Sequence, residues 1–301
     1  MPCFHPIRAF LPEPGSPDRR LIFSKLELSQ LEPIQVPCGR CIGCRLERSR
    51  QWAVRCVHEA SLYERNCFIT LTYSPEFVPT TLVKKDFQDF MKRLRKKFGS
   101  GVRYFHCGEY GSKLGRPHYH ACLFNFDFPD RELWSVRDGT KLYVSAELSK
   151  LWKFGFSTVG DVTFESAAYV ARYITKKVNG EKAAEHYQRV DQYGEIHEQV
   201  PEYITMSRRP GIGKPWLVKF ASDVYPHDRV VLRGRTFRPP KYYDSIFDVD
   251  SPEIMEEVKF QRQQRAKMDL SNCTFERLVV REKHQLLAFK QLKRGYEDDP
   301  L

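Results

Sequence analysis

Two histidines separated by one residue, His118 and His120, lie in an apolar and aromatic run that predicts a β-strand. Side chains two residues apart on a strand project from the same face, about 7 Å apart along the backbone, so both imidazoles could reach one metal ion. Glu109 lies at the end of the preceding predicted strand, a hairpin-length connection away, and could add a carboxylate. The alternative is a strand whose two histidines are only packed or hydrogen-bonded.

Two imidazoles and one carboxylate leave coordination positions open, which a metal needs in order to take phosphate oxygens. A mixed nitrogen and oxygen set suits Mg²⁺ or Mn²⁺, while ligand type alone leaves Zn²⁺ and Fe²⁺ open. The chemistry that this pattern indicates is cleavage of a phosphodiester bond.

Two tyrosines, Tyr169 and Tyr173, lie one turn apart in a helical pattern that runs from residue 166 to 178. At about 100° per residue, both tyrosines and Lys176 point to roughly the opposite side from the apolar arc, with Lys177 on the flank. The arc consists of Ala167, Val170, Ala171, Ile174 and Val178.

A phenol with a pKa of about 10 is a poor nucleophile at neutral pH, so attack on phosphorus needs a metal and nearby cations. Lys176 and Lys177 would supply the cations. Two tyrosines would allow two successive transfers at one site. The alternative is that they only stack on nucleic-acid bases.

Three cysteines within seven residues, Cys38, Cys41 and Cys44, predict a second metal site, because thiolates two residues apart form knuckles suited to Zn²⁺. The fourth ligand is not local; Cys3 is the first candidate, and Cys56 or His58 the next. An iron–sulfur cluster is a lesser option. The metal would be structural and would clamp the proline-rich N-terminus to a basic helix.

The formal net charge of the 301-residue chain is +11, and its Lys and Arg residues occur in clusters that commonly follow a phosphate backbone. We therefore expect DNA contacts from Arg45, Arg48, Lys92, Arg93, Arg116 and Arg172. No apolar run approaches the roughly 20 residues that cross a bilayer, and residues 1–11 lack the long apolar core of a secretory leader. We expect no membrane partner and a reducing compartment, with thiols free or metal-bound.

Strands are predicted over residues 21–28, 67–73, 102–110, 118–126 and 156–164, and helices over 45–63, 84–98 and 166–178. Their order predicts an α+β fold: an antiparallel central sheet with flanking helices on one face. Residues 195–209 could extend the sheet, residues 210–213 form a turn, and residues 252–294 form a charged helical tail. We expect a Cys-rich segment with a basic helix (residues 1–60), a catalytic domain (61–235) and the tail (236–301).

The segment from Arg116 to His120, with the two tyrosines and the lysines downstream, resembles the rolling-circle replication initiators of the HUH endonuclease superfamily. The segment from Val36 to Arg45, followed by Trp52-Ala-Val-Arg55, is similar to the replication initiation proteins of gokushoviruses, small single-stranded DNA phages of the microvirus family. The resemblance covers residues 35–180 well and the rest loosely.

This resemblance implies an HUH endonuclease-like fold with the histidine pair central in the sheet and residues 68–73 as a structural strand. Glu109, His118 and His120 match the metal-binding motif, and Tyr169 and Tyr173 match paired nucleophiles. It implies nicking of one strand at the replication origin, a 5′-phosphotyrosine bond, a 3′-hydroxyl for a host polymerase, and later rejoining.

The expected place of action is the cytoplasm of the bacterial host. Since no Walker motif is present, a host replication helicase would unwind the DNA. Two rival functions stay open: a noncatalytic zinc-containing nucleic-acid-binding protein, and a phosphodiesterase that activates water.

Overall fold

The computed structural model of the chain describes residues 3–12, 20–24, 31, 33–111, 115–137, 139–172, 182–190, 194–268 and 271–291. The chain divides into two compact units, a first unit of residues 1–48 and 262–292 and a second unit of residues 49–261 and 293–301. The three-part division expected from the sequence stays a prediction. Within the described ranges, no helix is long and apolar enough to cross a membrane.

The second unit is built on a seven-stranded sheet in the order β11-β4-β5-β3-β8-β7-β6, and its neighbouring strands pair antiparallel. The predicted antiparallel sheet is therefore confirmed. The strands are β3 (Asn66–Thr72), β4 (Arg103–Tyr110), β5 (Pro117–Phe124), β6 (Glu132–Arg137), β7 (Thr140–Val144), β8 (Ser157–Gly160) and β11 (Tyr203–Met206).

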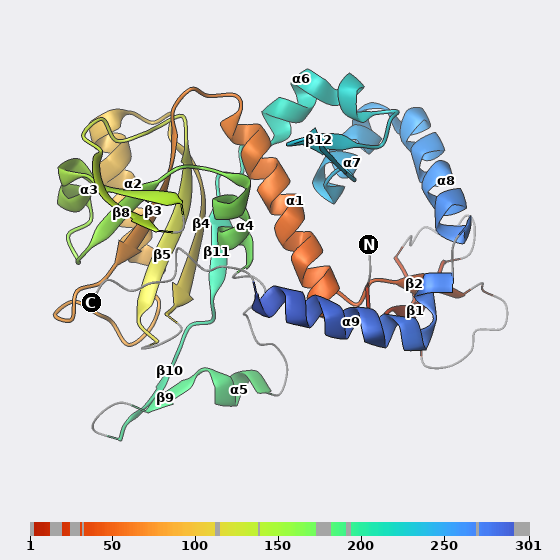
Figure 1. Cartoon of the computed structure of the whole chain (residues 1–301), viewed down its shortest axis with the longest axis horizontal. Helices are drawn as coiled ribbons and strands as arrows, with labels where there is room; N and C mark the ends of the chain where they lie inside the picture. Colours follow the sequence, from red (N-terminus) through yellow and green to blue (C-terminus); the bar gives the residue numbers. More distant parts are fainter. Residues whose placement is uncertain are drawn as a thin grey trace. The chain divides into compact units, whose positions relative to one another are not determined.

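Helices cover both faces of this sheet, so the prediction of helices on one face is wrong. Figure 1 shows α2 (Lys84–Phe98) and α3 (Ala146–Leu151) on one side, and α1 (Ile42–Ala60) and α4 (Phe164–Arg172) on the other. Every residue of β5 is buried, because the strand has a hydrophobic core on each face. Tyr119, Ala121 and Leu123 pack into the core on one face, and Cys122 and Phe124 pack into the core on the other. A strand that is apolar at nearly every position is typical of burial on both faces.

Several elements differ from the sequence prediction. The helix over residues 84–98 is confirmed, whereas the hairpin of β6 and β7 was not predicted. In place of a strand over residues 21–28, β1 (Ile7–Phe10) pairs with β2 (Pro33–Val36), and the described residues 21–24 contribute one bridge, Ile22 to Phe10. Residues 195–209 supply β11 to the sheet, and β10 (Ile196–Glu198) pairs with β9 (Gln188–Val190), which follows α5 (Lys182–His186).

A third core in the second unit is built around Tyr243 and Phe247. It joins α1 to α6 (Lys214–Val224), β12 (Val230–Leu232), β13 (Arg235–Phe237) and α7 (Lys241–Asp250). The predicted helical tail is confirmed as α8 (Pro252–Met268), the short 3₁₀ helix η2 (Ser271–Cys273) and α9 (Phe275–Lys290).

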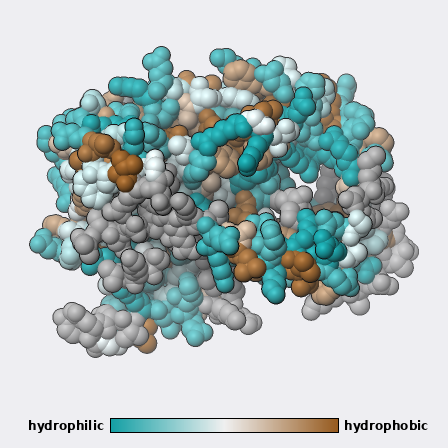
Figure 2. Space-filling view, in the orientation of Figure 1, coloured by the Kyte–Doolittle hydropathy of each residue, from teal (hydrophilic) through white to brown (hydrophobic). Residues whose placement is uncertain are grey.

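The face of the molecule in Figure 2 is mostly hydrophilic, with hydrophobic side chains in small separate patches.

Candidate metal centres and tyrosine site

The sheet register brings together the three residues that the sequence predicts as ligands of one metal. His118 and His120 project from the same face of β5, and Glu109 on β4 pairs directly with His118. The Nε2 atom of each histidine lies 2.8 Å from Oε1 of Glu109. The candidate ligand atoms of this Glu109–His118–His120 group, the triad below, all lie within 4.8 Å of one another. This group could hold a metal ion.

The other ring nitrogen of each histidine is held by a neighbouring group. Nδ1 of His118 lies 3.1 Å from the carbonyl oxygen of Arg116, and Nδ1 of His120 lies 2.9 Å from Oγ1 of Thr70, its direct cross-strand neighbour on β3. A carbonyl oxygen only accepts, so Nδ1 of His118 carries a proton in this arrangement, and Nε2 is the ring nitrogen that could bind a metal. Partners of this kind fix the tautomer and the ring orientation of metal-binding histidines.

Glu109 is 1% exposed yet carries a charge at neutral pH. Burial alone would raise the pKa of this carboxyl, but the charge of His118 and the hydrogen bonds from His118 and His120 outweigh it and lower the pKa to about 2. A buried anionic carboxylate beside two imidazoles fits a divalent cation.

Tyr169 reaches the triad from α4, the helix that packs across β4 and β5. Its hydroxyl donates to Oε1 of Glu109 over 3.4 Å, and its ring stands nearly perpendicular to that of His120, with the ring centroids 5.0 Å apart. Tyr169 is 2% exposed, so the prediction that it faces away from the buried side is wrong. The prediction assumed one buried arc, whereas α4 also meets α1, where Oγ of Ser49 donates to the carbonyl oxygen of Ala168.

Tyr173, Lys176 and Lys177 lie outside the described residues. Arg172 ends the described part of α4, with its guanidinium carbon 5.6 Å from the centroid of the Tyr169 ring.

The predicted DNA-contacting residues fall in different places. Lys92 and Arg93 lie on α2, which covers the sheet face opposite the triad, and Arg93 donates to the carbonyl oxygen of Leu151 over 3.0 Å. Arg45 and Arg48 belong to the part of α1 in the first unit. Arg116 lies next to the triad, where its carbonyl oxygen holds His118.

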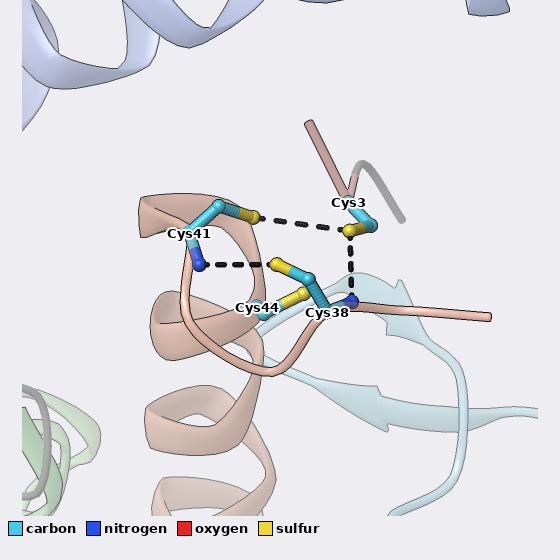
Figure 3. Close-up of side chains that lie close together, drawn as sticks. All are labelled: Cys3, Cys38, Cys41 and Cys44. Atoms are coloured by element: carbon cyan, nitrogen blue, oxygen red, sulfur yellow. Dashed lines mark hydrogen bonds between the residues drawn. The ribbon is translucent and has the colours of Figure 1, made fainter. Parts of the chain in front are cut away.

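Four thiols in the first unit lie close together, those of Cys3, Cys38, Cys41 and Cys44 (Figure 3). All four sulfur atoms lie within 4.8 Å of one another, and those of Cys3 and Cys41 are 4.0 Å apart. Sulfur atoms around a tetrahedral Zn²⁺ with bonds of about 2.3 Å would be about 3.8 Å apart. This group of four residues, the cysteine cluster below, could therefore hold a metal with small adjustments.

Backbone N–H groups point at these sulfur atoms, as they do toward thiolates. The N–H of Cys38 donates to Sγ of Cys3 over 3.1 Å, and the N–H of Cys41 donates to Sγ of Cys38 over 3.3 Å. Burial would raise the pKa of Cys38, but the N–H groups of Cys41 and Arg40 and the neighbouring thiols outweigh it and lower the pKa to about 7.

Of the three candidates for the fourth ligand, Cys3 lies in the cysteine cluster, whereas Cys56 and His58 do not. Cys56 and His58 belong to the second unit, where His58 stacks on Trp216 with the ring centroids 3.5 Å apart.

In the first unit, α9 packs beside the cysteine cluster. Leu278 is buried in one small core with Phe4, Cys41 and Cys44, and Nε2 of His5 lies 2.7 Å from Glu282. The predicted helical tail therefore contributes one buried side chain, Leu278, to the core of the first unit.

Comparison with known proteins adds a family to this geometry. The family model for the replication-associated protein ORF2/G2P matches residues 66–178, which include the triad and both tyrosines. Replication-associated protein VP4 of Bdellovibrio phage phiMH2K is 33% identical over 284 residues, which cover 89% of this chain and 85% of the relative. Replication-associated protein ORF2 of Spiroplasma virus 4 is 34% identical over 263 residues, which cover 81% and 77%.

A third relative, replication-associated protein ORF4 of Chlamydia phage 1, is 29% identical over 222 residues, which cover 70% of this chain and 53% of the relative. No solved structure matches the chain, so the HUH assignment stays a prediction. The extent and identity of the phage matches establish the family that the resemblance predicted. The chain belongs to the replication-associated proteins of small single-stranded DNA phages.

Proposed function

We propose that this protein starts replication of a small single-stranded DNA phage genome by nicking one strand at the origin and keeping the 5′-phosphate on a tyrosine. One observation carries the proposal: the hydroxyl of Tyr169 donates to the same carboxylate oxygen of Glu109 that both histidines contact. The hydroxyl of Tyr169 and the two histidines of the candidate metal site therefore meet at one atom, Oε1 of Glu109. The phage relatives, which are named as replication-associated proteins, support the role in replication.

Glu109, His118 and His120 would hold Mg²⁺ or Mn²⁺, which when bound polarises the scissile phosphate. The oxygen of Tyr169 attacks phosphorus, and the bond from phosphorus to the 3′-oxygen breaks. The phenol loses one proton and the 3′-oxygen gains one, so the step consumes no net proton. The burial of Tyr169 keeps water away from the resulting ester.

Tyr173 would act as the second nucleophile, with Lys176 and Lys177 steadying the charge on the phosphate. A phosphotyrosine ester retains the energy of the broken bond, so a free 3′-hydroxyl can reverse the attack and join the strand. In the host cell, the first 3′-hydroxyl would serve the host polymerase, while a host helicase separates the strands. Arg45, Arg48, Lys92, Arg93, Arg116 and Arg172 are proposed to contact DNA.

The cysteine cluster is proposed to hold a structural Zn²⁺. Thiolates that receive backbone N–H groups fit this ion, and the ligands come from two places in the chain, Cys3 and the segment from Cys38 to Cys44. The ion would hold the N-terminal segment to the start of α1.

The decisive experiment incubates single-stranded origin DNA with the protein and Mn²⁺, and detects a denaturation-resistant protein–DNA adduct. We expect Tyr169→Phe and Tyr173→Phe each to leave some adduct, and the double substitution to abolish it. Tyr143→Phe, which removes a phenol from the other sheet face, should leave the yield unchanged. Adduct retained in the double variant would refute the assignment.

The same assay separates the two rival functions. A noncatalytic binder gives no adduct, and its DNA affinity is unchanged in a chelator. A phosphodiesterase that activates water cleaves DNA in the double variant and leaves a free 5′-phosphate.

A further inference from the structure

We propose that Trp134 and Phe156 form a platform on which a base of the DNA strand stacks, within a few nucleotides of the cleaved bond. The inference rests on the proposed function, because it assigns the path of the strand that the triad would cleave. It names a nucleobase-binding subsite on the hairpin of β6 and β7, a part of the sheet outside the triad and tyrosine site.

The first observation is an exposed aromatic pair. Trp134 is 42% exposed and belongs to the large hydrophobic side chains that reach the surface. Its ring lies 5.1 Å from the half-buried ring of Phe156, with 57° between the ring planes. The pair therefore offers a broad aromatic surface to solvent.

The second observation is that Phe156 shares the sheet face of the triad. Thr158 on β8 pairs directly with Thr70 on β3, whose hydroxyl bonds to His120. Phe156 precedes Thr158 by two residues, so its side chain projects from the same face. The N–H of Thr72 donates to the carbonyl oxygen of Phe156 over 2.9 Å, which continues the strand pairing. Two strand spacings of about 4.8 Å put β8 about 10 Å from β5.

The third observation is the β-bulge that directs Trp134. The pairing of β6 with β7 passes from Leu133 opposite Tyr143 to Ser135 opposite Leu142, so Trp134 is an extra residue in β6. Bulges next to active sites re-aim a side chain. Here the extra residue lets the indole meet Phe156 on the triad face.

A nucleobase is the occupant that these observations favour. Every base has a flat π-face, and aromatic side chains beside a basic groove hold single strands by stacking regardless of sequence. The net charge of +11 attracts the DNA backbone. A strand that leaves the triad across the sheet toward β6 passes over β3 and β8, where Phe156 lies.

The test measures binding of a fluorescent oligothymidine of about 15 nucleotides, close to the upper site size of one single-strand-binding domain, in the Tyr169→Phe/Tyr173→Phe background, so that no covalent bond forms. We expect Trp134→Ala to weaken binding about tenfold and Trp134→Phe to retain most of it. Phe77→Ala is the matched control, because Phe77 is also an exposed aromatic residue, 53% exposed, but contacts Phe154 in the core of the other sheet face. It should leave the affinity unchanged.

A second measurement locates the base. One abasic residue is moved along a strand that spans the mapped cleavage position. An abasic residue at one position near that bond should weaken binding to the parent protein, and this loss should disappear in Trp134→Ala. If the loss persists in Trp134→Ala, the platform does not exist.

These outcomes separate the platform from the nicking proposal. If the parent protein forms no adduct but Trp134→Ala weakens binding, base stacking on Trp134 stands and the nicking chemistry falls. If adduct forms and Trp134→Ala changes only the melting temperature, then Trp134 merely protects the edge strand β6, and the platform is overturned.

Discussion

Thr70 is the side chain that sets the ring of His120, and sequence reasoning missed it. The Thr70 hydroxyl lies 2.9 Å from Nδ1 of His120, directly across the β3–β5 pair. The residue stands in a strand that was correctly predicted, but only the strand register shows that it faces a histidine. The triad itself was predictable, because a His-x-His pair and a nearby glutamate are local patterns.

We expect Thr70→Val to weaken Mn²⁺ binding at the triad at least about tenfold, because the hydrogen bond that orients His120 is lost. Thr70→Ser should restore most of the affinity. Titration of the DNA-free protein, followed by the paramagnetic resonance signal of free Mn²⁺, measures the effect. Thr158→Val, a change at the neighbouring position on β8, should bind Mn²⁺ normally; equal losses in both threonine variants would contradict the orienting role.

His58 illustrates how burial fixes a protonation state in the second unit. It is stacked on Trp216, its Nδ1 lies 2.9 Å from the hydroxyl of Tyr243, and burial lowers its pKa to about 3. Since the folded pKa lies below the unfolded value of about 6.5, unfolded chains bind the proton first on acidification.

The stability contributed by neutral His58 should be fully present above pH 6.5 and be lost as the pH falls toward 3. This site alone can add a slope of up to about 1.4 kcal/mol per pH unit to the free energy of unfolding. Urea denaturation between pH 7 and pH 5 should show a shallower pH dependence in His58→Gln than in the parent protein. Parallel curves would show that His58 does not titrate in this way.

At the scale of elements, the long periodic segments were predictable and the register-dependent features were not. The strands β3, β4 and β5 and the helix α2 follow apolar patterns in the sequence. The hairpin of β6 and β7 escaped prediction because the bulge at Trp134 interrupts the alternation that marks a strand. The predicted orientation of Tyr169 was wrong because the sequence does not show that α4 is buried on more than one side.

The turn that ends at Gly213 ties α6 to α1. Gly213 has φ +79°, its N–H donates to Oε2 of Glu59 over 2.7 Å, and a Cβ atom there would lie 2.5 Å from the hydroxyl oxygen of Tyr243. The predicted turn over residues 210–213 is confirmed. The contact that requires a glycine at its end comes from Tyr243 on α7, which is distant in the sequence.

We expect Gly213→Ala to lower the free energy of unfolding by about 3 kcal/mol, from backbone strain and the clash with Tyr243. Gly234→Ala is the control, because Gly234 has a similar φ of +72° but open space where its Cβ would lie. Strain alone should cost about 1 kcal/mol there. Similar losses in the two variants, measured by urea denaturation, would rule out the clash.

At the scale of the whole molecule, the two candidate metal centres belong to different units. The cysteine cluster lies in the first unit and the triad in the second. The spacing of Cys38, Cys41 and Cys44 in the sequence indicated three of the four ligands. Cys3 is 35 residues away from Cys38, so only the fold distinguishes it from Cys56 and His58 as the fourth ligand.

We expect Cys41→Ser to loosen the first unit and leave the second unit folded, because a structural metal stabilises the segments that bind it. Hydrogen exchange should become faster in α9 and in residues 3–12, while Mn²⁺ binding at the triad persists. Cys273→Ser, a change at an exposed thiol, should leave exchange as it was. Unaltered protection of α9 in Cys41→Ser would contradict a structural role of the cluster.

The core that joins Phe4 and Cys41 to Leu278 also has a consequence during synthesis. The ribosome makes the cysteines early and α9 near the end, so this core lacks Leu278 until α9 has been synthesised. The sheet, whose strands lie between residues 66 and 206, emerges completely before then. The core of the first unit can therefore be completed only after every strand of the sheet has been synthesised.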